Sequence, residues 1–258
     1  ALKVSPVPDG DTGTNMSLTK DPAATELEQR FSSDLKKIAD KAAWGSLMGA
    51  RGNSGVILSQ LFRGFAQGIP ANKDSIGAME LALAYKSGVD AAYRAVMRPV
   101  EGTILTVARE TADKMIFEAK RTNDLVIVLE NTLSYGEKVL AKTPEMLQEL
   151  KEANVVDAGG KGLLFLMEGF LEIIKNPQLD ISAVQKSPDI GQVEDISHIK
   201  TYQKIKYMYC TELFVTGKAI DMEALKQELS NLGDSMIVTG TPELVKIHIH
   251  TNSPDLVL

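Results

Sequence analysis

The chain has 258 residues, of which 44 % are hydrophobic and 24 % are charged, a balance typical of a folded chain large enough for two domains. Its net charge of −6 and scattered Lys and Arg residues argue against a nucleic-acid partner. The single cysteine, Cys210, cannot form an internal disulfide, so we expect a reducing, cytoplasmic location. No apolar run reaches the ~18 residues of a transmembrane helix, and we expect no signal peptide.

A rigid, polar stretch opens the chain at residues 6–16 and carries two carboxylates, Asp9 and Asp11, on either side of one glycine. Proline and glycine favour a tight loop here, in which both carboxylates can turn toward one point. Neutral oxygen donors follow directly: Thr12, Thr14 and Asn15. Mg²⁺ prefers such oxygen ligands and completes its shell with water and substrate phosphates. The alternative is an ordinary surface turn, since the same residue types are common in turns.

Apolar residues recur every three or four positions from Leu27 to Ala42, which predicts an amphipathic helix. A second glycine-rich segment, residues 48–55, then runs into another apolar helical pattern. Such a segment directs free N–H groups and the positive end of a helix dipole at one spot, which suits a phosphate. The candidate phosphate ligands are Asn53, Ser54 and Gly55. Ser54 is also a candidate N-cap, so a capped helix start without a ligand is the alternative.

Caps and prolines predict further helix starts between residues 74 and 174. They lie at Asp74 or Ser75, at Gly102-Thr103, at Asp124, at Thr143-Pro144, and after a loop at residues 157–162. Long helices joined by short polar turns, with no alternating segment before residue 175, predict an all-α domain over residues 1–175.

Pro, Gly and acidic residues replace the periodic pattern at residues 176–200, which predicts a linker. Beyond it, strands are predicted at residues 205–215, 235–239 and 244–250, and a helix at residues 222–232. These elements make a small α/β domain over residues 201–258. The chain starts without Met and ends in what reads as the opening of another helix, so we expect a fragment of a longer protein.

Cys210, His248 and His250 form a second candidate site, in the small domain. His248 and His250 are two positions apart on a predicted strand and therefore share one face. A cysteine from a neighbouring strand would complete a three-ligand zinc site with one open position. Two alternatives remain: the three residues are unrelated, or a histidine serves phosphoryl relay or substrate docking.

Four segments, in the same order, resemble the ATP-binding subunit of bacterial fatty acid kinase, whose first domain is related to the nucleotide-binding domain of dihydroxyacetone kinase. They are residues 6–16, 49–65, 98–107 and 155–163. The resemblance implies an antiparallel barrel of about eight helices with metal and nucleotide at one end. About seven are recognisable here, and the first would lie upstream of Ala1.

The resemblance also implies roles for individual residues. Asp9 and Asp11 would bind Mg²⁺ on ATP and support catalysis. The nucleotide would be bordered by Thr12, Thr14, Asn15, Asn53, Ser54, Gly55, Thr103, Asp157, Ala158, Gly159 and Gly160. Relatives carry another acidic or amide residue ahead of the first motif, where this chain has only Ala1 to Val4, so a third metal ligand is missing from that position. The family has cysteine and histidines at the motifs that contain Cys210, His248 and His250, which favours zinc there.

Arg51 and Lys161, which lie beside these loops, are explained equally well as phosphate contacts and as solvated cations.

The expected function is that of an ATP-dependent kinase subunit. It would transfer the γ-phosphate to the carboxylate of a fatty acid held by a separate fatty-acid-binding protein, giving an acyl phosphate. Two alternatives remain open: a kinase for a small hydroxyketone such as dihydroxyacetone, and a non-catalytic, nucleotide-dependent regulatory or scaffold module. A homodimer is a further expectation.

Overall fold

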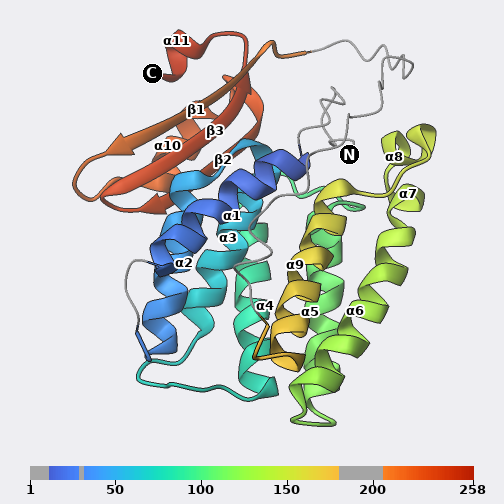
Figure 1. Ribbon diagram of the computed structural model, residues 1–258. Coiled ribbons are helices and arrows are strands. Elements are labelled where there is room, and N and C mark those ends of the chain that lie inside the picture. The colour runs from blue at the N-terminus through green and yellow to red at the C-terminus, as the bar shows by residue number, and fades with distance from the viewer. Residues whose placement is uncertain (1–11, 29–31, 180–205) are drawn as a thin grey trace.

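The structure is a computed structural model that describes residues 12–28, 32–179 and 206–258. Long helices run side by side in the first part of the chain, and a small three-stranded sheet lies across one end of them (Figure 1). This arrangement confirms the predicted fold class, a helical domain followed by a small α/β domain. None of the described helices is both long and apolar enough to cross a membrane.

The described part of the helical domain contains seven long helices and two short ones, α7 and α8. Their bounds are α1 (Thr12–Glu28), α2 (Leu35–Gly49), α3 (Gly52–Gly68), α4 (Ala78–Ala95), α5 (Ile104–Ala119), α6 (Leu125–Ala141), α7 (Thr143–Met146), α8 (Gln148–Ala153) and α9 (Ala158–Lys175). Their packed faces share one core of buried apolar side chains, including Leu58, Val107 and Leu164. Where α3 crosses α4, glycines allow close approach: a Cβ on Gly64 would lie 2.4 Å from the Ser87 carbonyl oxygen.

Two of the predicted helix starts, at Gly102-Thr103 and at Asp124, are confirmed. The Asp124 carboxylate accepts hydrogen bonds from the N–H groups of Val126 and Ile127, and Thr103 Oγ1 accepts one from Leu105 N–H. Each cap satisfies a backbone donor that would otherwise lack a partner at the helix start.

Several predicted starts and ends are wrong. Residues from Thr12 onward belong to helix α1 rather than to a loop. The helix predicted from Leu27 to Ala42 is divided, because α1 ends at Glu28 and the Asp34 carboxylate caps a new helix at Leu35. The predicted loop after residue 157 is instead the first turn of α9.

Three further start positions also differ from the prediction. Arg51, rather than Ser54, is the N-cap of α3. Gly77, rather than Asp74 or Ser75, is the N-cap of α4. Helix α7 begins at Thr143 itself, so its N-cap is Lys142.

The small domain is an antiparallel sheet with the strand order β1-β3-β2. Its elements are β1 (Tyr209–Thr216), α10 (Met222–Leu229), β2 (Gly233–Thr241), β3 (Leu244–Thr251) and α11 (Pro254–Val257). The register of β2 against β3 shifts between Asp234 and Ile237, and Ser235 has a φ of 52° at this bulge. Of the predicted linker, residues 176–200, the structure describes only residues 176–179.

The two faces of this sheet contact different partners. Val238, Val245 and Ile247 belong to a small core with residues of α10. Ile237 points the other way, joins the core of the helical domain, and makes a bridge to Val96 just after α4. The sheet therefore covers the end of the helical domain at which α3 begins and α4 ends.

Candidate nucleotide and metal sites

A cavity of about 530 Å³ lies between this end of the helical domain and the edge of the sheet. It brings together six residues that the sequence analysis assigned to the nucleotide, although they come from four separate segments. They are Thr12, Asn53, Ser54, Thr103, Asp157 and Gly159. Each lies at or next to a helix start: that of α1, α3, α5 or α9. Helix starts carry partial positive charge, so their convergence favours an anionic ligand.

The first turn of α3 offers backbone donors to this cavity. Gly52, with a φ of 57°, turns the chain into the helix, and the first helical hydrogen bond runs from Gly55 N–H to the Arg51 carbonyl oxygen at 3.1 Å. The N–H groups of Asn53 and Ser54 precede that bond and have no hydrogen-bond partner among the described residues. They are the amides that a phosphate at this helix start would engage.

Two side-chain atoms in the cavity wall also lack partners. Thr12 Oγ1 and Asn53 Oδ1 are buried and make no hydrogen bond within the described part of the chain. A buried polar atom without a partner costs roughly 1–3 kcal/mol. A polar ligand in the cavity would remove that cost, so the residues present fit a polar, anionic ligand such as a nucleotide.

Asp157 is the buried carboxylate of this cavity. It is 5 % exposed, caps α9, and accepts a hydrogen bond from Gly160 N–H at 2.7 Å. Burial raises the pKa of the Asp157 carboxyl to about 6, although the N–H groups of Gly160, Ile104 and Gly159 oppose this rise. Its charge therefore changes near neutral pH.

Other predicted residues lie elsewhere. Thr14 and Asn15 follow Thr12 on α1 but do not line the cavity. Gly55 packs against α1, where a Cβ would come within 2.4 Å of Thr19 Oγ1. Gly160 packs against α5, where a Cβ would lie 2.7 Å from Val107 Cγ2. Ala158 is outside the lining as well, and Asp9 and Asp11 lie outside the described residues.

Both cations that the sequence analysis left open have protein partners away from the cavity lining. Lys161 Nζ is 2.9 Å from Glu137 Oε1 and 4.6 Å from the centre of the Phe165 ring. Arg51 Nη1 donates to the Ala50 carbonyl oxygen at 3.0 Å. The structure thus favours the solvated-cation interpretation for these two residues.

Sequence reasoning missed the contribution of the small domain and of the α4–α5 connection to the cavity. The lining includes Arg98, Lys206, Tyr207, Asn231, Asp234 and Ser235. Arg98 was inside a recognised segment but carried no assigned role. The others had no motif to mark them, because their place depends on how the sheet packs against the helices.

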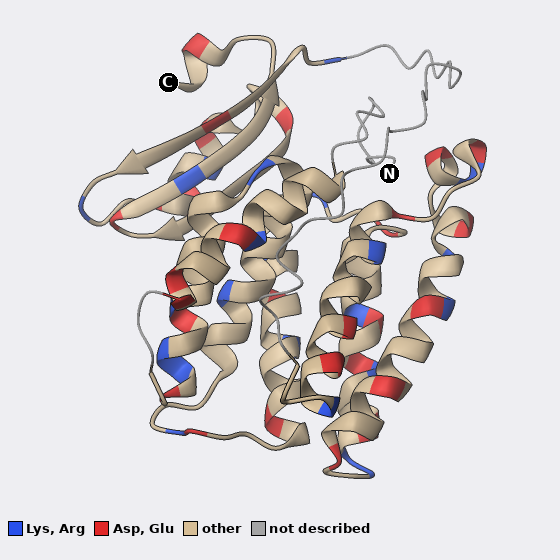
Figure 2. Ribbon diagram, viewed as in Figure 1, with Lys and Arg blue, Asp and Glu red and all other residues tan. Residues whose placement is uncertain are grey.

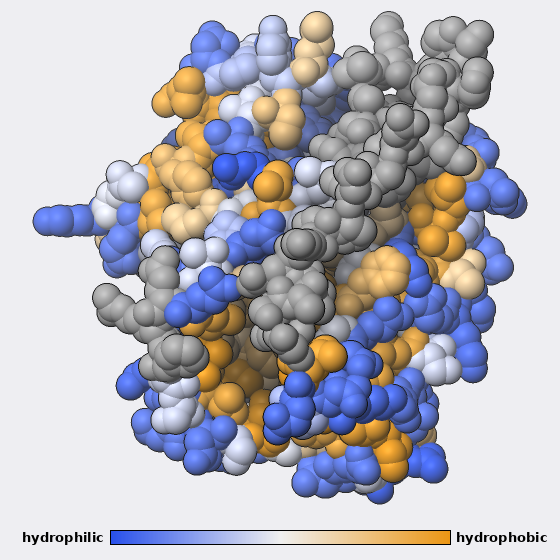
Figure 3. All heavy atoms as spheres, in the orientation of Figure 1, coloured by the Kyte–Doolittle hydropathy of each residue, from blue (hydrophilic) through white to orange (hydrophobic). Residues whose placement is uncertain are grey.

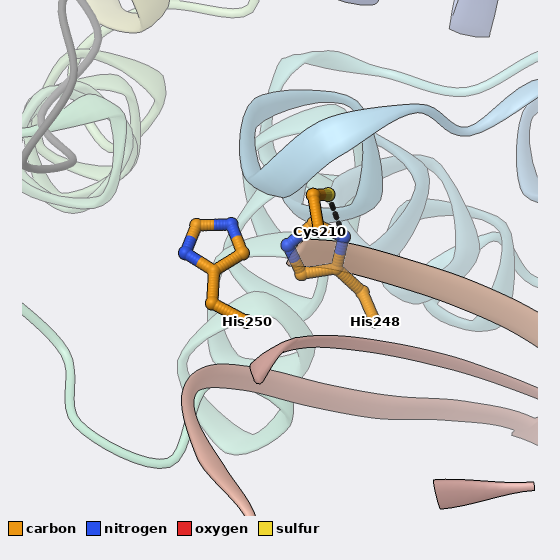
Figure 4. Close-up of side chains that lie close together, drawn as sticks. All are labelled: Cys210, His248 and His250. Atoms are coloured by element: carbon orange, nitrogen blue, oxygen red, sulfur yellow. Dashed lines mark hydrogen bonds between the residues drawn. The ribbon is translucent and has the colours of Figure 1, made fainter. Parts of the chain in front are cut away.

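The Cys210, His248 and His250 side chains do converge, as Figure 4 shows. Cys210 on β1 is the register partner of His250 on β3. Candidate ligand atoms of the three residues lie within 4.8 Å of one another. Cys210 Sγ is 3.8 Å from His248 Nδ1, and the two imidazole centres are 5.2 Å apart. This spacing suits a common metal ion.

The surroundings of His248 also suit a metal ligand. The residue is completely buried, its Nδ1–H donates to Glu212 Oε1 at 3.0 Å, and its Nε2 has no partner among the described residues. A carboxylate that holds one ring nitrogen while the other faces a metal is a common arrangement. His250 Nδ1 lies 3.8 Å from Asp234 Oδ1, and Asp234 lines the nucleotide cavity, so the two candidate sites are neighbours.

Glu212 links this cluster to the helix start of α3. Its Oε1 also accepts a hydrogen bond from Gly52 N–H at 2.8 Å, and its Oε2 is 3.7 Å from Lys246 Nζ. Burial alone would raise the pKa of Glu212, but the His248 hydrogen bond and the charge of Lys246 outweigh it and lower the pKa to about 2. Lys246, 1 % exposed, donates to the Ala50 carbonyl oxygen. Glu212 and Lys246 thus hold the glycine-rich turn before α3.

The described surface carries charges of both signs and scattered apolar side chains. Lys and Arg are interspersed with Asp and Glu along the helices in Figure 2. The face in Figure 3 is a mosaic of hydrophilic and hydrophobic side chains. Single apolar residues such as Phe165 and Phe170 on α9 are exposed.

Comparison with known proteins agrees with this geometry. The DAK2 domain family matches residues 6–172, and the FakA-like middle domain family of fatty acid kinase matches residues 206–258. Protein YloV of Bacillus subtilis is 45 % identical over 268 residues, which cover 100 % of this chain and 48 % of that protein.

Two uncharacterized staphylococcal proteins are similar to the same extent. One from Staphylococcus haemolyticus is 45 % identical, and one from Staphylococcus aureus strain USA300 is 43 % identical, each over 260 residues. Each match covers 98 % of this chain and 47 % of the relative. The chain thus spans about half the length of these relatives. Together, the helical fold, the cavity at its helix starts and the two family matches show that the chain belongs to the FakA-like fatty acid kinase family of DAK2-domain proteins.

Proposed function

We propose that the chain is the nucleotide-binding part of an ATP-dependent kinase subunit. The observation that carries this proposal is the single cavity at which Thr12, Asn53, Ser54, Thr103 and Asp157 meet. Four helix starts meet at this cavity, and the unpartnered amides of Asn53 and Ser54 at the start of α3 suit the phosphates of ATP. The cavity volume of about 530 Å³ lies within the range of small-molecule sites.

In the proposed reaction, an oxygen of a fatty acid carboxylate attacks the γ-phosphorus of ATP. The bond between the γ-phosphorus and the β,γ-bridging oxygen breaks, ADP leaves, and an acyl phosphate forms. Asn53 and Ser54 would hold phosphate oxygens, and Arg98 and Lys206 would add positive charge in the same lining. Asp9 and Asp11 would bind Mg²⁺, which would neutralise phosphate charge when bound.

The proposal includes the acceptor and its carrier. A separate fatty-acid-binding protein would present the carboxylate. The full-length protein would act as a cytoplasmic homodimer. The match of residues 206–258 to the FakA-like middle domain supports a protein that works together with another chain.

The test measures Mg·ATP binding by this chain and ATP consumption by the full-length protein with its lipid-carrying partner and fatty acid. Asn53→Ala and Ser54→Ala keep the backbone amides but remove the side chains that line the cavity, so each should weaken Mg·ATP binding by about tenfold through the loss of a side-chain contact. Asp9→Ala and Asp11→Ala should abolish turnover. Ser75→Ala, an exposed change before α4, is the matched control and should leave both unchanged.

Each rival has its own outcome. Turnover with dihydroxyacetone but not with fatty acid would establish the hydroxyketone kinase. Tight Mg·ATP binding without turnover of either acceptor would establish the regulatory module. Parental binding in both the Asn53→Ala and the Ser54→Ala variant would overturn the nucleotide assignment.

We also propose that Cys210, His248 and His250 bind Zn²⁺. The buried Nε2 of His248, which has no partner among the described residues, and the convergence of the three ligand atoms support this site. Elemental analysis of protein purified without a metal-affinity tag should find one zinc per chain in the parent and a loss in Cys210→Ser. Zinc content that is absent from the parent, or unchanged in the variant, would remove the proposal.

A further inference from the structure

A second cavity, of about 370 Å³, lies between the two domains and is separate from the nucleotide cavity. The same elements, α3 and β2, line both cavities, but with different residues. Asn53 and Ser54 of α3 face the nucleotide cavity, whereas Gln60 and Arg63, further along the helix, face the second one. Neither the predicted site residues nor the Cys/His cluster contributes to it.

The charged groups in the second cavity do not balance. Its lining holds three cations, Arg63, Arg94 and Lys226, and one carboxylate, Glu223. Lys226 Nζ already pairs with Glu223 Oε1 at 2.7 Å. Neither arginine forms an ion pair with a carboxylate in the described part of the chain. Two positive charges therefore remain in one cavity of a protein whose net charge is −6.

Arg63 is the half-buried arginine of this cavity. One of its five N–H donors, on Nη1, binds Thr239 Oγ1 at 3.2 Å. Burial, and after it the positive charge of Arg94, lower the pKa of the Arg63 guanidinium. Arg94 is exposed, and an anion that reaches the cavity from solvent could contact both guanidinium groups and offset their repulsion.

The chemistry of the lining indicates which anion fits. Guanidinium groups bind phosphate oxygens through paired N–H donors, and two of them match the double negative charge of a phosphate group. Gln60, 2 % exposed, adds a buried amide, and Thr239 adds a hydroxyl. The volume is also within the range of small-molecule sites.

We propose that this cavity binds the phosphate group of a small phosphorylated ligand, or inorganic phosphate itself. Arg63 and Arg94 come from the helical domain, whereas Thr239 and Lys226 come from the small domain. The bound anion therefore bridges the domain interface and stabilises the packing of the sheet on α3 and α4. This site is independent of the proposed kinase activity.

The test titrates inorganic phosphate into the chain and follows the melting temperature (Tm), with sodium chloride at equal ionic strength as the reference. Phosphate should raise the Tm of the parent by several degrees at saturation. Arg63→Gln and Arg94→Gln should each weaken phosphate binding by about tenfold or more, measured by isothermal titration calorimetry. Arg121→Gln removes the same charge after α5, outside the lining, and should bind phosphate like the parent.

A phosphomonoester that binds more tightly than inorganic phosphate would identify the ligand as a phosphorylated metabolite, and equal or weaker binding would identify inorganic phosphate.

A gain-of-charge variant tests the same idea without removing an arginine. Gln67 is exposed and lines the cavity, so Gln67→Glu should supply the missing negative charge. It should raise the Tm without phosphate and reduce the response to phosphate. Gln227→Glu, on α10 but outside the lining, is its control and should do neither.

Three outcomes would overturn the proposal. The first is a parental phosphate response in both arginine variants. The second is an equal response to acetate, which would indicate simple carboxylate pairing. The third is a response that both variants keep but that saturating Mg·ATP removes, which would place the phosphate in the nucleotide cavity instead.

Discussion

The two faces of the three-stranded sheet are built from alternate residues of the same strands, yet they contact different partners. Val245, Ile247 and Ile249 face the core that the strands share with α10. Lys246 and His248 lie on the opposite face, and both are buried against the helical domain. One face holds the small domain together through apolar contact, and the other joins the two domains through charges, hydrogen bonds and the apolar side chain of Ile237. The comparison shows that strand alternation does not always mean one buried and one exposed face.

The largest expected effect comes from the apolar face. Ile247 is 1 % exposed, and Ile247→Ala should lower the free energy of unfolding by about 2–5 kcal/mol, because the change leaves a cavity in a small core. Chemical denaturation measures this loss. Ile173→Ala, on the exposed side of α9, is the control and should cost about 1 kcal/mol or less. Equal losses in the two variants would contradict the assignment of this face as a core.

The next effect comes from the polar face. Glu212→Gln removes the carboxylate partner of Lys246, and we expect a loss of about 2 kcal/mol in unfolding free energy because the ammonium stays buried. Replacing Lys246 with Met in the same chain should recover part of this loss. A double-mutant cycle measures the coupling, and purely additive losses would show that the pair does not act as a unit.

Asp157 should give a smaller, pH-dependent effect in the helical domain. Its pKa in the folded chain, about 6, is above its ordinary value of 3.8, so the folded state binds the proton more tightly. Its stabilising contribution is complete below pH ~4 and is lost as the pH rises through ~6. Asp157→Asn should therefore reduce the fall in unfolding free energy between pH 4 and 7 by about 1–2 kcal/mol. Chemical denaturation at several pH values measures this difference. An unchanged pH profile would contradict the burial argument.

The smallest effect sharpens the contrast between buried and exposed charge pairs. Lys36 and Asp40 pair on the surface of α2, with side chains 28 % and 53 % exposed. Asp40→Asn should cost about 0.5 kcal/mol or less, and 1 M salt should remove the difference. A loss as large as that of Glu212→Gln would show that exposure does not separate the two pairs.

Local sequence patterns predicted the helical domain and its principal motifs well. Apolar periodicity located the long helices, and the helix starts at Gly102-Thr103 and at the Asp124 cap were predicted correctly, because both signals depend on residues within a turn or two. The alternation in β3 likewise placed His248 and His250 on one face. These features depend on the backbone geometry of a few neighbouring residues, which a short segment of sequence is enough to determine.

The same local patterns did not predict several helix boundaries or the contacts between the two domains. Ser54 was a plausible cap for α3, yet the structure starts the helix at Gly52, whose N–H binds Glu212, 160 positions further along the chain. Likewise, no motif indicated that Arg63 and Arg94 would share a cavity with β2 and α10.

The amino-acid order by itself determined which segments become helices or strands and which residue types stand at the helix starts, because neighbouring residues set the backbone preferences. Only the tertiary structure decided that four of those starts surround one cavity and that charged side chains of the sheet are buried beside it. Such contacts join distant segments, and their stability depends on the burial and electrostatic fields that arise when the domains pack.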